Sequence, residues 1–184
     1  MVHDRLVSWA LVGVLLLMKP APLFSQTAGT EEYRLKAAFV YRFPQFVEWP
    51  PSALEGRDSL QICVSQPNPF GNALQDLVSG ETLAGRPIVV RLVEGPNALA
   101  GCQILFVSER SRPPVKAWLD AASNRPLLTI GDSVGFLDEG GIIALRVIER
   151  RVRFEINAAA ANRSQLQLSS QLLRLAMSVR GAAQ

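Results

Sequence analysis

Short apolar runs alternate with helical patterns along this chain, and the alternation limits its possible folds more than any other feature. Segments rich in β-branched and aromatic residues, each about as long as a strand, occur at 60–65, 88–93, 103–107, 126–130, 141–147 and 152–156. Helical patterns lie at 31–47, from about 68, and at 111–122, 158–162 and 169–179. There is no internal repeat and no long linker. This order predicts one α/β domain, with a mixed β-sheet flanked by helices.

The N-terminus has the pattern of a secretory signal peptide. Residues 6–18 form an uncharged, apolar stretch of 13, with Arg5 before it. At about 1.5 Å per residue this stretch is too short to cross a hydrocarbon layer of ~30 Å. A basic start, a short apolar stretch and small residues after it are typical of a segment that directs export. An uncleaved anchor stays open as the alternative, because Lys19 and Pro20 make an unusual exit from the apolar stretch.

Small residues at Ser25 and Ala28 suit the last position before a cleavage site. We expect a signal peptide over 1–25, with cleavage as late as Ala28, and an α/β domain over 29–180. The expected location of the mature protein is the periplasm.

Two cysteines, Cys63 and Cys102, both lie in the part that would be exported. An even pair in an oxidising compartment predicts one disulfide within the domain. Each cysteine lies in a strand-like run, as two neighbouring buried strands would require. Two unpaired buried thiols are the alternative.

The only histidine of the chain, His3, belongs to the predicted signal peptide. Its removal excludes a Ser-His-Asp or Cys-His triad and any histidine-bound metal in the mature protein. The tripeptide at 131–133 follows a strand, as the nucleophile of some hydrolases does, but Ser133 has no base to take its proton. A strand-ending turn is the simpler interpretation.

No phosphate-binding glycine motif occurs in the chain, and its formal net charge is only +3. We therefore expect no enzyme, no catalytic residue, no metal and no cofactor. The charge is too small to predict binding to nucleic acid.

The segment 151–157 has the clearest two-sided pattern. Its apolar residues alternate with Arg153, Glu155 and Asn157, so one side of the strand should face the core and the other should be polar. A polar side of this kind is usually just solvated. In an exported domain without catalytic residues it is also a candidate recognition surface.

A group of aromatic residues forms a second candidate surface in the first helical segment. The six aromatic residues are Tyr33, Phe39, Tyr41, Phe43, Phe46 and Trp49. Core packing should account for most of them, but one helix face cannot bury all six in its own core. Phe39, Phe43 and Trp49 are the candidates for contact with a ligand or a second copy. Pro44 should end or bend this helix, because its ring clashes with the preceding turn.

Five blocks of the sequence, in order, resemble the YfiR family of periplasmic proteins. The blocks lie at 32–50 (EYRLKAAFVYRFPQFVEWP), 62–74, 102–109, 128–145 and 151–176. The resemblance implies a periplasmic α/β domain that often dimerises. It also implies a regulator that restrains an inner-membrane diguanylate cyclase until an outer-membrane lipoprotein relieves the repression. Cyclic di-GMP output and biofilm formation would then depend on this chain.

The family pattern also carries over to individual residues. Cys63 and Cys102 lie where members of the family place a disulfide. Arg153, Glu155 and Asn157 match the block RFEIN, and Gln171 lies in the block at the start of the last helix, so these four are the expected partner-binding residues. The chain departs from the family at Pro44, and it lacks the second cysteine pair that some members carry in the hairpin.

Two hypotheses follow for the function. The first is a non-enzymatic periplasmic regulator that binds and restrains a membrane signalling protein, such as a diguanylate cyclase or a sensor kinase. The alternative is a periplasmic domain that binds a small ligand and serves a sensor or a transporter. We also expect a homodimer.

Overall fold

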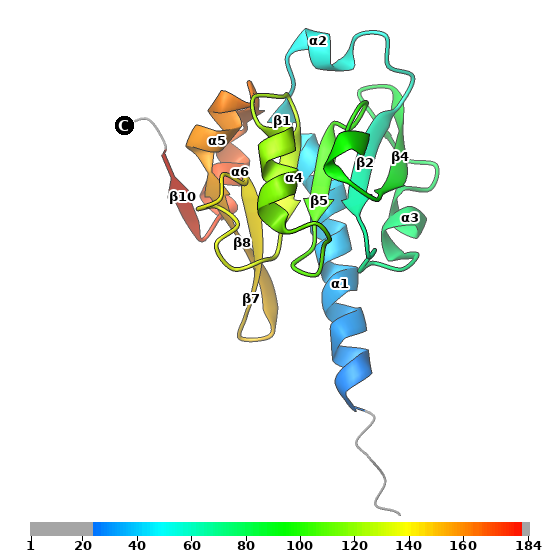
Figure 1. The fold of residues 1–184 in the computed structure, drawn as a ribbon, viewed down its shortest axis with the longest axis vertical. Helices are drawn as coiled ribbons and strands as arrows, with labels where there is room; N and C mark the ends of the chain where they lie inside the picture. Colours follow the sequence, from blue (N-terminus) through cyan, green and yellow to red (C-terminus); the bar gives the residue numbers. More distant parts are fainter. Residues whose placement is uncertain (1–23, 182–184) are drawn as a thin grey trace, which may run out of the picture.

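The computed structural model describes residues 24–181, so nearly all of the predicted signal peptide lies outside the described residues. Eight strands form one mixed sheet in the order β10-β8-β7-β6-β5-β2-β4-β3 (Figure 1). Its centre is five parallel strands, listed in spatial order: β4 (Arg86–Val93), β2 (Leu60–Ser65), β5 (Ile104–Val107), β6 (Leu128–Gly131) and β7 (Ile143–Ile148). The predicted α/β domain with a mixed sheet is confirmed.

The two edges of the sheet break the parallel pattern. At one edge β8 (Arg151–Asn157) pairs antiparallel with β7 as a hairpin, and β10 (Ser178–Arg180) runs parallel to β8. At the other edge β3 (Thr82–Leu83) pairs antiparallel with β4.

Helices cover both faces of the sheet (Figure 1). One face carries α1 (Phe24–Arg42) and α3 (Ala73–Val78), and the other carries α4 (Val115–Ala122). Two further helices, α5 (Ala158–Arg163) and α6 (Ser170–Leu175), follow β8. Of the described helices, none is both long enough and apolar enough to cross a membrane.

Short elements complete the fold. They are α2 (Pro51–Leu54) and the 3-10 helices η1 (Phe43–Phe46) and η2 (Pro96–Ala98). A second sheet is a two-stranded antiparallel ribbon of β1 (Val47–Glu48) and β9 (Gln167–Leu168).

The inner parallel strands β2, β5 and β6 are buried on both faces, which is the usual condition of parallel sheets. In β2, Ile62 and Val64 face the core under α1, while Cys63 faces the core under α4. The same alternation in β5 sends Phe106 to the first core and Leu105 to the second. A continuous apolar run in the sequence therefore serves two cores.

The first α-helix ends just before Pro44, as predicted, and continues as a 3-10 helix. The α-helix ends at Arg42, and Pro44 lies in the first turn of η1. A proline ring is tolerated in a first turn and not inside a helix, because it has no N–H to donate.

Two predicted helices begin later than expected. The helix expected from about Asn68 begins at Ala73, because the Asn68 side chain accepts a hydrogen bond from Phe70 N and donates one to Gly71 O, which stabilises a turn. The helix expected from Ser111 begins at Val115, directly after two prolines.

The last predicted helix, 169–179, is wrong in its C-terminal part. Helix α6 ends at Leu175, and the chain then runs along β8 as β10. Met177 N donates to Phe154 O at the start of this pairing. The exposed edge of β8 offers backbone hydrogen bonds that an extended segment can use and a helix cannot.

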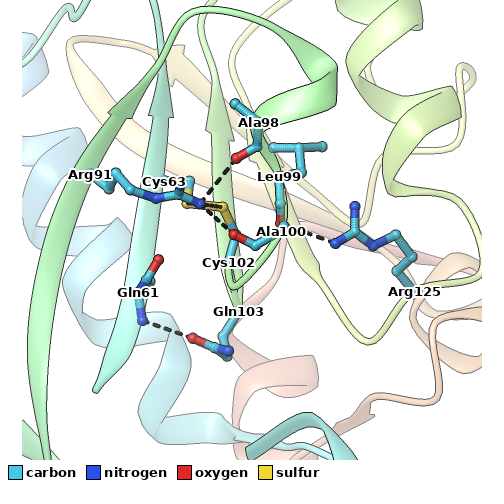
Figure 2. The surroundings of a disulfide bond; sticks show 9 residues. All are labelled: Gln61, Cys63, Arg91, Ala98, Leu99, Ala100, Cys102, Gln103 and Arg125. Carbon is cyan, nitrogen blue, oxygen red and sulfur yellow. Dashed lines mark hydrogen bonds between the residues drawn. A yellow bond between two sulfur atoms is a disulfide. The ribbon is translucent and has the colours of Figure 1, made fainter. Parts of the chain in front are cut away.

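The predicted disulfide joins Cys63 in β2 to Cys102, just before β5. Among the described residues no cysteine is free. Figure 2 shows the Arg91 guanidinium beside the bond, with Nη2 3.0 Å from the Cys102 sulfur. The same nitrogen donates to Ala98 O and Ala100 O. Arg91 thus fastens the loop before β5 to the strand that neighbours the disulfide.

We predict that the disulfide is a main contributor to stability. It closes a loop with a sequence separation of 39 residues, and replacing both cysteines by alanine should lower the free energy of unfolding by about 4 kcal/mol through the entropy of the unfolded chain. Urea denaturation of the oxidised protein and of the double variant measures this change. An unchanged urea midpoint in the double variant, or in the reduced wild type, would contradict the prediction.

Candidate interaction site

A buried ion pair fastens α1 to the carboxyl ends of the central strands. Lys36 Nζ lies 2.7 Å from Asp132 Oδ2, and the two side chains are 5% and 1% exposed. Asp132 follows β6, and its other oxygen accepts from Glu109 N, after β5, at 2.8 Å. Ligands of open α/β sheets often bind at this edge. Here protein side chains occupy it.

Two more residues of α1 complete the arrangement. Tyr33 donates its hydroxyl to Asp132 Oδ2 at 2.9 Å, and Lys36 lies 4.5 Å from the centre of the Tyr33 ring. Glu32 Oε1 is 2.5 Å from Lys36 Nζ. The lysine therefore has two carboxylates as partners, which compensates for much of the cost of its burial.

These contacts shift two pKa values upward. Burial, reinforced by the negative charge of Asp132, raises the pKa of Tyr33 to about 12. Burial by itself would lower the pKa of Lys36, but its hydrogen bonds to Asp132 and Glu32 outweigh burial and raise it. Among the described residues, these contacts serve to hold α1 against the end of β6.

A neighbouring side of α1 forms an apolar groove. The rings of Phe39 and Phe43 are 5.7 Å apart, and Phe154 of β8 lies 6.0 Å and 5.1 Å from them, respectively. The groove has a volume of about 330 Å³, and we call it the aromatic groove; its lining residues are Ala38, Phe39, Arg42, Phe43, Gln45, Phe46, Phe154, Leu172 and Leu175.

Exposed apolar surface continues beyond the aromatic groove. Leu175 of α6 is 63% exposed, and Met177, Leu35 and Val147 are also exposed. Leu35 precedes Phe39 by one helical turn, and Val147 pairs across the hairpin with Val152 on the Phe154 face. An apolar surface of this kind is typical of a contact with another molecule.

The polar side of β8 has mostly internal contacts. Glu155 lies 3.3 Å from Arg146 Nε and accepts from Ser178 Oγ, and Asn157 accepts from Ala160 N as the N-cap of α5. Arg153 is exposed, and so is Gln171 on the first turn of α6. Of the four expected partner-binding residues, Arg153 and Gln171 are thus the two exposed ones.

The predicted aromatic candidates separate into two places. Phe39 and Phe43 line the aromatic groove, while Trp49 lines a different cleft beside the β1–β9 ribbon. The two lists of lining residues have no member in common. Sequence spacing put these aromatics in one group because η1 and β1 were not recognised as separate elements.

The tripeptide at 131–133 forms a turn. Asp132 is occupied by Lys36, Tyr33 and Glu109, and among the described residues Ser133 Oγ has no hydrogen-bond partner. No group of three histidine, cysteine or acidic residues within 24–181 has the arrangement of a metal site.

Sequence reasoning missed the pairing of Lys36 with Asp132. One signal was present, because Lys36 stands between apolar residues on the side of the helix that carries Ala37 and Val40. A charged residue on a buried face needs a partner, although its identity depends on the tertiary fold.

We predict that Lys36→Met lowers the free energy of unfolding by about 3–5 kcal/mol, because it leaves Asp132 buried without its cation. Lys116→Met is the matched control: it removes an exposed pair with Asp120 and should change stability little. Urea denaturation measures both. Equal effects of the two variants would show that burial of the first pair is unimportant.

We also predict a loss of stability at alkaline pH. The unfolded Tyr33 loses its proton near pH 10.0 and the folded one only near 12, so rising pH favours the unfolded chain between these values. The contribution of Lys36 is fully present below its unfolded pKa of 10.5 and is lost as pH rises through its higher folded pKa. Above about pH 9 the melting temperature should fall less steeply with rising pH in Tyr33→Phe than in the wild type. Thermal melts at several pH values measure this slope. Identical slopes would contradict this assignment.

Comparison with solved structures shows a fold shared with one of them at low sequence identity. A conserved domain protein from Vibrio cholerae O1 biovar El Tor matches with a TM-score of 0.51 and 13% identity, over 78% of this chain and 60% of that one. The ABC domain in complex with L-Trp from Streptococcus pneumonia matches with a TM-score of 0.47 and 10% identity, over 70% of this chain and 57% of that one. The chain thus spans about three fifths of the length of these proteins. No curated protein matches it.

Comparison with family models agrees with the resemblance of the five sequence blocks. The model described as YfiR/HmsC-like matches residues 33–177. This range includes the disulfide, the Lys36–Asp132 pair and every lining residue of the aromatic groove. The chain therefore belongs to the YfiR/HmsC-like family.

Proposed function

We propose that this YfiR/HmsC-like protein is a non-enzymatic periplasmic regulator that binds and restrains a membrane signalling protein. Family membership over residues 33–177 is the observation that carries the proposal. The sequence supports it with a signal-peptide pattern and with no histidine in the mature chain. The partner is a diguanylate cyclase, so the output is the level of cyclic di-GMP. A sensor kinase is the alternative partner, and an outer-membrane lipoprotein would relieve the restraint.

The aromatic groove supports the proposal as a docking surface. Its floor is apolar and rigid, because Phe43 and Phe154 are nearly buried and pack against each other. Its rim is open at Leu175. A segment that fills the groove would bury apolar surface worth ~25 cal/mol per Å². Hydrophobic grooves of this type commonly receive the apolar side of an amphipathic helix.

The charge of the groove lining indicates which kind of partner segment it would bind. Among the described lining residues Arg42 is the one that carries a charge, and it is exposed. Its side chain donates to Gln45 Oε1 at 3.4 Å and lies over the Tyr41 ring, without a carboxylate partner among the described residues. The partner segment is therefore expected to place a carboxylate beside its apolar residues.

The polar side of β8 is a weaker candidate than the groove. Glu155 and Asn157 already have partners in Arg146, Ser178 and the first turn of α5. Releasing them to bind another protein would cost the contacts they make. Arg153 and Gln171 remain candidates for the rim of the interface.

The second candidate function, a domain that binds a small ligand, is supported by a different place. The cleft at Trp49 has a volume of about 630 Å³, within the range usual for ligand sites. Such a ligand could serve a sensor or transporter, or could act on the regulator itself.

The proposed function predicts a selective loss of regulation when the groove is blocked. Leu175→Glu should weaken binding to the partner's periplasmic domain about tenfold or more, because it puts a charge against apolar surface. Cyclic di-GMP should then rise to the level of a deletion strain. Val134→Glu is the matched control, since Val134 is 91% exposed and lies outside the groove. Co-purification from membranes and extraction of cyclic di-GMP measure the two effects.

Three results would count against this assignment. Unchanged cyclic di-GMP in a deletion strain that keeps the intact cyclase would overturn the regulatory role. Equal effects of Leu175→Glu and Val134→Glu would show that the partner contact lies outside the groove. A wild-type dimer that becomes a monomer in Leu175→Glu, with partner binding retained, would make the groove a surface for self-association.

A further inference from the structure

The cleft beside the β1–β9 ribbon is separate from the groove proposed for the partner. One wall is the segment that leaves β1, with Trp49, Pro50 and Pro51. The other wall is the end of α5, with Asn162, and the turn after it, with Gln165. The volume of about 630 Å³ is large enough for a small organic molecule.

Trp49, which lines this cleft, has an unsatisfied hydrogen-bond donor. Its indole Nε1 is buried and has no hydrogen-bond partner among the described residues. Buried tryptophan N–H groups usually find an acceptor. By contrast, the indole of Trp118, in the core under α4, donates to Pro113 O at 3.0 Å. Because this nitrogen is covered, an acceptor reaches it only when the indole turns toward the cleft, and a ligand that brings an acceptor there would satisfy a donor that the protein leaves unpaired.

The opposite wall supplies carboxamides. Asn162, Gln165 and Gln167 all line the cleft, and all three are exposed. A carboxamide both donates and accepts hydrogen bonds, and a hydroxyl group does the same. Three carboxamides facing one space therefore suit a ligand with several hydroxyl groups.

The charges of the cleft exclude an anionic ligand. Of the described lining residues Glu48 is the charged one, and none is lysine or arginine. A phosphate or a free carboxylate would meet the Glu48 carboxylate with no cation to compensate. A carboxylate can instead accept hydrogen bonds from neighbouring hydroxyls of a neutral ligand.

The apolar part of the cleft consists largely of ring side chains. The Trp49 indole and the rings of Pro50 and Pro51 offer apolar surface beside the polar groups. A pyranose ring combines an apolar C–H face with hydroxyls around its edge, which matches this distribution. We propose that the cleft at Trp49 binds a neutral saccharide. This site goes beyond the proposed regulatory function and does not depend on it.

Titration with neutral sugars tests the site. D-glucose, N-acetyl-D-glucosamine and trehalose are added to the exported protein, and binding is followed by calorimetry and by tryptophan fluorescence. At least one of them should bind saturably and change the emission. Sodium phosphate, L-glutamate and an alanine tripeptide are the comparison probes and should not bind.

Two substitutions test the contacts. Gln165→Gly removes one carboxamide at a residue with φ +57°, a conformation that glycine adopts without strain. Trp49→Phe keeps an aromatic ring but removes the N–H donor. Each should weaken binding of the responding sugar roughly tenfold. Phe39→Leu, in the aromatic groove, is the control and should leave the affinity unchanged.

The outcomes separate the alternatives. No saturable response to any of the three sugars overturns the proposal. Saturable binding of phosphate, glutamate or the tripeptide without sugar binding overturns the ligand class. Sugar affinity that is unchanged in both Gln165→Gly and Trp49→Phe overturns the location. None of these results bears on the cyclic di-GMP measurement, so the two proposals fail independently.

Discussion

The ion pair between Lys36 and Asp132 determines how the first helix lies on the sheet. A buried charge without its counter-charge costs several kcal/mol, so α1 strongly prefers the position in which Lys36 reaches Asp132. Phe39 follows Lys36 by three residues and lies on a neighbouring stripe of the helix, next to Phe154. An interaction at the carboxyl ends of the strands thereby positions the apolar surface on the neighbouring stripe of the helix.

The aromatic groove exists because the helices do not cover the whole sheet. The parallel centre is closed by α1 and α3 on one face and by α4 on the other. Near β8 the cover consists of Phe39 and Phe43, which contact Phe154, and of α6, which has only six residues. The Phe154 face of β8 is therefore covered at its middle and open around Leu175. Residual apolar surface at the end of an otherwise closed core is a simple way to build a docking surface.

Much of the central fold could be predicted from the sequence, because buried parallel strands leave long apolar runs. The strand at 60–65 and the pairing of Cys63 with Cys102 are confirmed.

Elements of two or three residues could not be predicted: β1, β3, β9 and β10 are too short to show a period, and they form only where another strand edge is available. The turn at Asn68 was missed for a related reason, since a side chain that hydrogen bonds to nearby backbone competes with the helix that its neighbours favour. For the candidate surfaces, too, the sequence predicted which residues are buried but not which residues they contact. Alternation correctly put Phe154 inside, but it could not show that Glu155 is engaged by Arg146 and Ser178.

The β1–β9 ribbon joins the two surfaces. Val47 pairs with Leu168 and Glu48 with Gln167, and Ser169 N donates to Phe46 O at 2.9 Å. At one end of this ribbon Phe46 lines the aromatic groove, and at the other Trp49 lines the cleft. The ribbon consists of two residue pairs and has a contact surface at each end. If an occupant of one surface shifts the ribbon, the affinity of the other surface changes, and thermodynamic linkage requires the same factor in both directions.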